Sequence, residues 1–168
     1  MEIIMSSREN ILYMLKVNQQ VLKRLLDDIT EEESLEQGAD GHNHIRWQAG
    51  HIVHSNASIL RRLGGIVEDS ERYEKLFGGG SKISDNPSVY PSMDELRARL
   101  YELQEQSITA AEKISDKALE ADADWGDKKL PAWKPVSFLC MHDFYHAGQI
   151  VNIRKILKRE QPFGYDRT

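Results

Sequence analysis

The amino-acid sequence predicts an all-α protein, and a four-helix bundle is the simplest architecture for it. Apolar residues recur at helical spacing along four segments, and two of these segments begin with a capping-box pair. No segment shows the alternation of polar and apolar residues that indicates a β-strand. The chain of 168 residues fits one domain, residues 1–168, and is long enough to bury a hydrophobic core.

The first two predicted helices cover about residues 7–29 and 44–63. Ser6 and Glu9 form a predicted capping box, in which each side chain accepts a hydrogen bond from the other residue's backbone N–H. The Gly-Gly pair at 64–65 suits the end of the second helix, because glycine tolerates the left-handed conformation that follows many helices.

The third predicted helix begins after Pro91, with Ser92 and Glu95 as a second capping box. Its apolar stripe consists of Leu96, Leu100, Leu103, Ser107, Ala110, Ala111, Ile114 and Ala118. The fourth predicted helix covers about residues 135–159. The connection over 65–91 is long enough to permit one crossover in the bundle.

Composition and charge argue against several classes of protein. Hydrophobic residues make up 40% of the chain and charged residues 29%, as in soluble globular proteins. The net charge of −5 argues against a nucleic-acid surface, and no apolar run approaches the roughly 20 residues that span a membrane. The N-terminus lacks the apolar stretch of a signal peptide, and the single cysteine, Cys140, excludes an intramolecular disulfide. We therefore expect a cytoplasmic protein in which Cys140 is a small buried apolar residue.

The segment MHDFYHAGQI in the fourth predicted helix carries two histidines, His142 and His146, one helical turn apart. Both side chains therefore leave the same face of the helix. A face of this kind can chelate one metal ion, because the helix holds two imidazoles at a fixed separation. It can equally hold two buried, hydrogen-bonded histidines, and the segment alone leaves both interpretations open.

Two metal-binding motifs fit this segment poorly. In zinc proteases a Glu follows the first histidine as general base, whereas Asp143 is one methylene shorter, and Glu160 is the one acidic residue at a useful distance downstream. Di-iron bundles need Glu-x-x-His on two helices, and the nearest match is Asp143-x-x-His146. A ligand from the second helix, His51 or His54, fits better, since three histidines leave coordination positions open for water or substrate.

Together, WQAGHIVHS in the second helix and HDFYHAGQI in the fourth resemble the DinB/YfiT-like family of metal-binding four-helix bundles. The resemblance covers most of the chain. It implies an up-down-down-up bundle with one long crossover, and one divalent transition metal per chain bound by His51, His142 and His146. Nickel, zinc, iron and manganese all fit imidazole ligands, so the residues leave the identity of the metal open. The resemblance also implies a homodimer.

The function that this resemblance implies is that of a metal-dependent enzyme acting on a small molecule. Two reactions fit an open metal site: transfer of a low-molecular-weight thiol to an electrophile, and hydrolysis. We favour thiol transfer, because no positioned general base for hydrolysis is visible in the sequence. Ala147 stands where many members of the family carry Arg, which weakens an inference about the substrate. The alternative is a non-enzymatic bundle that binds metal, responds to stress or serves as an interaction module.

The other polar residues near the two motifs are expected to have structural rather than catalytic roles. His54 is expected to support the site or fill the core, and His42 and His44 are expected to be exposed at the entrance of the second helix. Asp143 is expected to cap a helix or form an ion pair, and Gln149 to hydrogen-bond a ligand histidine or the backbone. The small and aromatic residues expected to pack helices together or to line a pocket are Gly148, Trp47, Trp125 and Trp133.

Overall fold

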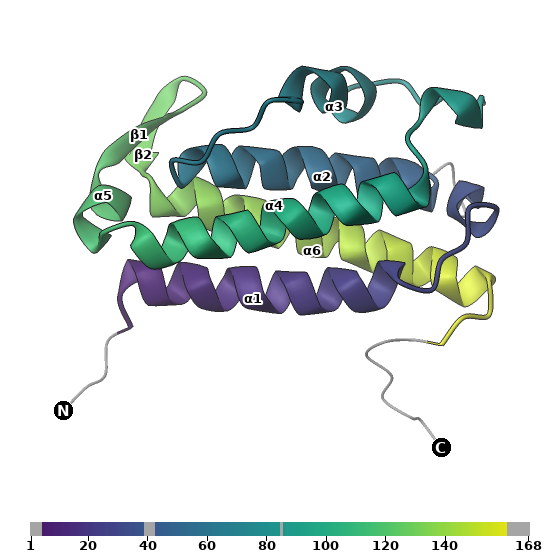
Figure 1. The fold of residues 1–168 in the computed structure, drawn as a ribbon, viewed down its shortest axis with the longest axis horizontal. Helices are drawn as coiled ribbons and strands as arrows, with labels where there is room; N and C mark the ends of the chain where they lie inside the picture. Colours follow the sequence, from purple (N-terminus) through teal and green to yellow (C-terminus); the bar gives the residue numbers. More distant parts are fainter. Residues whose placement is uncertain (1–4, 39–42, 85, 161–168) are drawn as a thin grey trace.

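Four long helices form a bundle in the computed structural model, which describes residues 5–38, 43–84 and 86–160. These helices are α1 (Ser7–Leu26), α2 (Ile45–Arg62), α4 (Met93–Lys113) and α6 (Trp133–Ile156). α1 and α6 run in one direction along the bundle, and α2 and α4 run in the other (Figure 1). The predicted up-down-down-up bundle is therefore confirmed. The one long crossover is the connection from α2 to α4, which lies along the outside of α2 (Figure 1).

Short elements occupy the connections between the long helices. They are η1 (Glu33–Leu35), α3 (Ser70–Phe77), η3 (Pro87–Val89), α5 (Asp116–Glu120), β1 (Asp122–Trp125) and β2 (Lys128–Pro131). The prediction of no β-strands was wrong, because β1 and β2 pair antiparallel around a turn at Gly126, where φ is +62°. Strands of four residues are too short for an alternating pattern to stand out in the sequence.

The predicted helix starts agree well with the structure, while the ends are less accurate. Ser6 and Glu9 form the capping box at the start of α1. At the start of α4 the hydroxyl of Ser92 accepts a hydrogen bond from the N–H of Glu95. The third predicted helix was too long, since α4 ends at Lys113 and Ala118 belongs to α5. In the part of the chain that the structure describes, none of the helices has the length and hydropathy needed to span a bilayer.

α2 is the most enclosed helix, and its burial positions the candidate site. It packs against α3, α4 and α6, and every residue from Ile45 to Val53 is buried. Further along, one stripe of the helix is less covered, and it carries His54, Ser58 and Arg62. A helix enclosed on three sides holds its side chains in fixed directions, which a preformed site requires.

The start of α2 is capped by His44, which was wrongly expected to be exposed. His44 is buried, and its Nδ1 accepts a hydrogen bond of 3.0 Å from the backbone N–H of Trp47. Burial, and then the charge of Arg46, lower the pKa of His44 to about 4, which keeps the capping ring neutral. His42 lies outside the described residues.

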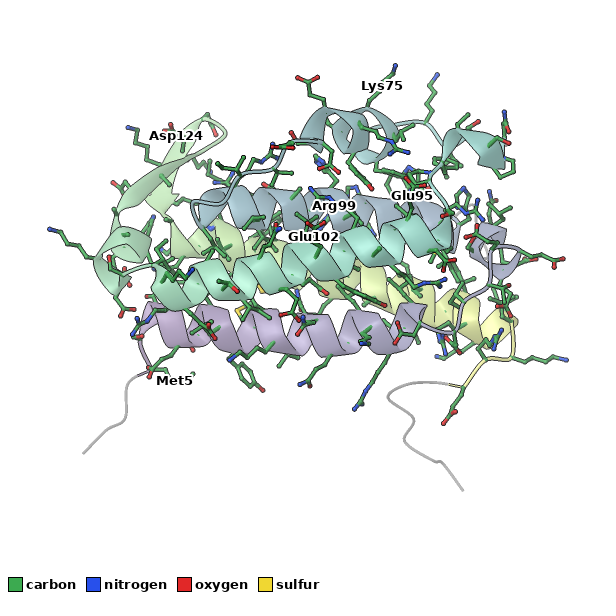
Figure 2. All side chains as sticks on the ribbon, viewed as in Figure 1. Met5, Lys75, Glu95, Arg99, Glu102 and Asp124 are labelled. Carbon is green, nitrogen blue, oxygen red and sulfur yellow. The ribbon has the colours of Figure 1, made fainter. Side chains whose placement is uncertain are left out.

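The crossover is tied to the bundle by charged and apolar contacts. Arg99 of α4 donates hydrogen bonds to both carboxylate oxygens of Asp69, directly before α3, and it also bonds Glu102. Figure 2 shows Arg99 and Glu102 on α4. At the other end of α3, Phe77 is fully buried against α2. These contacts fix the backbone around Phe77, which takes part in the candidate site.

Candidate metal centre

Three histidine side chains meet between α2 and α6. His51 comes from α2, and His142 and His146 come from successive turns of α6. Nε2 of His142 lies 3.2 Å from Nε2 of His51 and 3.1 Å from Nε2 of His146. Each of the three offers a ring nitrogen, and all of these nitrogens lie within 4.8 Å of one another. The structure thus brings together the three histidines singled out in the sequence.

The hydrogen bonds behind two of these rings fix where their protons lie. Nδ1 of His51 faces the backbone carbonyl of Phe77, which can only accept, so Nδ1 carries the hydrogen. Nδ1 of His146 faces Oε1 of Gln48, whose amide nitrogen donates to Oε1 of Gln149. His146 therefore also carries its hydrogen on Nδ1. In the neutral rings both Nε2 atoms bear lone pairs, and these lone pairs point into the cluster.

The third ring, His142, stands beside a buried carboxylate. Its Nδ1 is buried and has no hydrogen-bond partner among the residues that the structure describes. It lies 4.0 Å from Oδ1 of Asp143, which likewise has none there. Oδ2 of Asp143 accepts hydrogen bonds from Asn56 (2.9 Å) and Asn18 (3.4 Å). Instead of capping a helix, Asp143 is completely buried in a network that joins α1, α2 and α6. A hydrogen bond between Nδ1 of His142 and Oδ1 of Asp143 would place the ring hydrogen of His142 on Nδ1 and leave a lone pair on its Nε2.

Burial favours the neutral forms of His51 and His146. Burial, and then the charges of His51 and His142, lower the pKa of His146 to about 3. Burial also lowers the pKa of His51, partly offset by its hydrogen bond to Phe77. A metal ion binds the neutral imidazole, so no proton has to be displaced from His51 or His146 near neutral pH. The donor set therefore fits a divalent transition metal.

The cluster is walled on one side and open on another. The ring of Trp47 stacks on His51 at 4.9 Å with an interplanar angle of 11°, and Tyr145 packs edge-on against His146. His51 and His146 are buried, but the side chain of His142 is 27% exposed. Solvent therefore reaches the cluster past His142.

Gly50 is required next to His51, because the ring of Phe77 occupies the space of a side chain. A Cβ atom on Gly50 would lie 2.3 Å from two atoms of that ring. The close approach brings the carbonyl of Phe77 to Nδ1 of His51. Gly148, in contrast, was wrongly expected to permit close helix packing: a Cβ there meets nothing within 4 Å.

Two further expectations can be compared with the geometry. His54 is outside the cluster, and its Nε2 lies 3.7 Å from a carboxylate oxygen of Glu74. Gln149 does not bond a histidine of the cluster in the described structure. Its Oε1 instead accepts a hydrogen bond from Gln48, whose own Oε1 contacts His146. Sequence analysis missed Gln48, although its buried amide lies in the same motif as His51. The carbonyl of Phe77 has no signal in the sequence, since every residue has one.

The fold and the cluster together define a class of protein: a helical bundle in which imidazoles from two helices converge on an open site. A family model described as the DinB superfamily matches residues 14–150. The chain belongs to this superfamily.

Comparison with solved structures shows the same fold. A DinB-like protein from Bacillus cereus superposes with a TM-score of 0.73 and 20% sequence identity, over 94% of this chain and 97% of that one. YfiT from Bacillus subtilis, described as a probable metal-dependent hydrolase with an unusual four-helix bundle topology, gives a TM-score of 0.67 and 14% identity, over 95% and 93% of the two chains. None of the curated proteins matches the sequence.

We predict that Gly50→Ala destabilises the protein by about 1–3 kcal/mol, because the new methyl group would overlap the ring of Phe77. Urea unfolding followed by circular dichroism measures this change. Gly148→Ala is the matched control: the same substitution in an open part of a helix should be neutral or stabilising by up to about 1 kcal/mol. Equal stability of the two variants would contradict the tight contact.

Proposed function

We propose that this protein is a metal-dependent enzyme that binds one divalent transition metal through His51, His142 and His146. The observation that carries the proposal is the convergence of the three Nε2 atoms, with the ring hydrogens of His51 and His146 bonded on the far side. Three protein ligands leave coordination positions open, which is the arrangement of catalytic rather than structural sites. The side on which His142 is exposed is where a small-molecule substrate would bind.

We propose transfer of a low-molecular-weight thiol to an electrophile as the reaction. A bound metal supplies a Lewis acid that lowers the pKa of a thiol or of water. The thiol gives up its proton to solvent, its sulfur forms a bond to the electrophilic carbon, and the leaving group departs with its electron pair. This reaction needs no protein base beside the nucleophile. Asp143, the carboxylate nearest in sequence, is buried in hydrogen bonds to Asn18 and Asn56.

Hydrolysis is the second candidate, and the description of YfiT as a probable metal-dependent hydrolase favours it. Hydrolysis would use the same open position, with water in place of the thiol. A non-enzymatic metal-binding bundle is the alternative from a different class. The exposure of His142 argues for an open rather than a sealed site.

We also propose a homodimer located in the cytoplasm, where the buried thiol of Cys140 stays reduced.

We predict that the purified protein carries about one transition metal per chain and that His51→Ala loses it, since two imidazoles on one helix bind more weakly than three. Elemental analysis after gel filtration measures the metal content. His54→Ala is the matched control, because it removes a histidine one turn away on the same helix that is outside the cluster. A metal-free wild type that cannot be reconstituted would overturn the proposed centre.

We predict that the metal-loaded protein forms a thioether from a low-molecular-weight thiol and an electrophile such as an aryl chloride or an epoxide. Product formation should fall to the uncatalysed rate in His51→Ala and remain in His54→Ala, with circular dichroism confirming that both variants are folded. Absence of metal-dependent product with every thiol tested would reject thiol transfer. Metal-dependent ester or amide hydrolysis in the same samples would then select the second candidate.

We predict that Gln48→Leu weakens metal affinity about 10–100-fold, because the ring of His146 loses the acceptor that fixes its orientation. Competition with a chromophoric chelator measures the affinity. Gln104→Leu is the matched control: Gln104 is another buried amide, in α4, and neither of its polar atoms has a hydrogen-bond partner in the described part of the structure. Its replacement should leave the metal affinity unchanged and the stability equal or higher. Equal affinities of the two variants would show that Gln48 does not position the ring.

A further inference from the structure

α2 carries an open polar stripe that begins at the histidine cluster. After the fully buried stretch, the less covered residues on this helix are His54, Ser58, Arg61 and Arg62. They follow His51 at intervals of three and four residues, so they lie along one side of the helix. Nδ1 of His54 is buried, and within the described ranges of the chain it has no hydrogen-bond partner. This stripe is the side of α2 on which polar side chains are accessible from outside the bundle.

A cavity of about 370 Å³ lies at the far end of this stripe. Its lining residues come from α2 and from the β-hairpin region: Ser58, Arg61, Arg62, Ala123, Asp124 and Ala132. Figure 2 shows Asp124 on the hairpin, at the end of the bundle where α2 finishes. The volume is sufficient for one end of a small molecule.

The guanidinium of Arg62 lacks a carboxylate partner in the described part of the chain. Nη1 of Arg62 donates to the backbone carbonyl of Asp124 at 3.2 Å, and its Nε is buried without a partner. The carboxylate of Asp124 is largely exposed, and its Oδ1 lies 4.0 Å from Nζ of Lys129. Burial, and then the charge of Arg61, lower the pKa of Arg62. Two arginines and one aspartate are among the lining residues, so the lining carries a net positive charge, which favours an anion in the cavity.

Aromatic rings connect this cationic cavity to the metal centre. The guanidinium of Arg62 lies 4.6 Å from the centre of the Trp125 ring. The Trp125 ring is 5.6 Å from that of Phe138, and the Phe138 ring is 6.4 Å from that of His142. Phe138 is half exposed, although an apolar ring of this size is usually buried. The row of rings offers an apolar wall between the open histidine and the cation.

We propose that the substrate is a bipartite small molecule whose reacting atom lies at the histidine cluster and whose carboxylate is bound by Arg62. The apolar or aromatic middle of the molecule packs along Phe138 and Trp125. This inference rests on the proposed function for the position of the reacting end. Arg62 lies eleven residues after His51, about 16 Å along the helix axis. Helical side chains lean towards the N-terminus, so the guanidinium reaches back towards the cluster and shortens this span.

The test compares a charged and an uncharged ligand of the same size. The probes are 4-(mercaptomethyl)phenylacetate and its primary amide, titrated into the cobalt-loaded protein. The charge-transfer absorption that a thiol produces on cobalt reports binding without any catalytic turnover. The wild type should bind the carboxylate about tenfold more tightly than the amide, the gain expected from one charge-assisted pair.

The variant Arg62→Gln should abolish this preference and leave the affinity for the amide within about twofold, because the apolar wall and the metal remain. Arg24→Gln is the matched control: it removes the same charge from the last turn of α1 at an exposed position. The control should keep the preference of the wild type. A preference that persists in Arg62→Gln, or that is absent from the wild type, overturns the proposal.

A second titration separates this inference from the proposed function. Calorimetry with 4-methylphenylacetate and its amide tests the metal-free protein, in which the anion subsite acts alone. If no thiol produces a cobalt absorption but the metal-free protein prefers the carboxylate through Arg62, the metal enzyme is rejected and the subsite stands. If both thiols bind cobalt equally, the metal centre stands and the subsite is rejected.

Discussion

The candidate site depends on one constraint: the Nε2 atoms of three imidazole rings must point towards one another, although no covalent bond holds the rings together. The Nε2 atoms of His51 and His146 both present lone pairs to Nε2 of His142, at 3.2 and 3.1 Å, and Nε2 of His142 carries at most one hydrogen to share with them. The arrangement persists because acceptors behind the rings fix their tautomers: the carbonyl of Phe77 for His51, and the amide of Gln48 for His146. Free energy from the packing of the bundle stabilises this array, and a cation is the natural complement to it.

The topology of the bundle explains why one of these acceptors comes from a distant segment. α2 and α4 run in the same direction, so the chain must return along the length of the bundle between them (Figure 1). The return segment contains α3, and the absence of a side chain at Gly50 lets the ring of Phe77 settle against α2. The crossover thus does more than connect two helices. It supplies the backbone oxygen that orients His51, and a shorter connection could not place it there.

Much of this could be predicted from the sequence, because the signals were periodic or chemically distinctive. The apolar stripes and capping boxes located the four helices, and the spacing of His142 and His146 located one half of the site. The remaining features arise from contacts between segments far apart in the chain. Gln48 was missed because a buried amide looks like any polar residue until its partner, 98 residues later, is known. His44 was placed on the surface because its burial depends on contact with Tyr90, far along the chain. The strands were missed because four residues are too few for an alternating pattern to be detected.

The buried polar network around Asp143 bears on whether the site is rigid enough for catalysis. A carboxylate with no exposed surface raises the free energy of the fold unless neighbours donate hydrogen bonds to it, and Asn18 and Asn56 do so from two other helices. Any sliding of α1 or α2 against α6 would break one of these bonds and leave buried polar atoms without a hydrogen-bond partner. The network therefore favours a single register of the three helices, and it includes the residue next to His142. Gln48 and Phe77 fix the rings, while Asp143 fixes the helices that carry them. The edge of His142 that is partly exposed lies near Phe138, whose ring centre is 6.4 Å away, and this edge is the side of the cluster that the network leaves accessible to solvent.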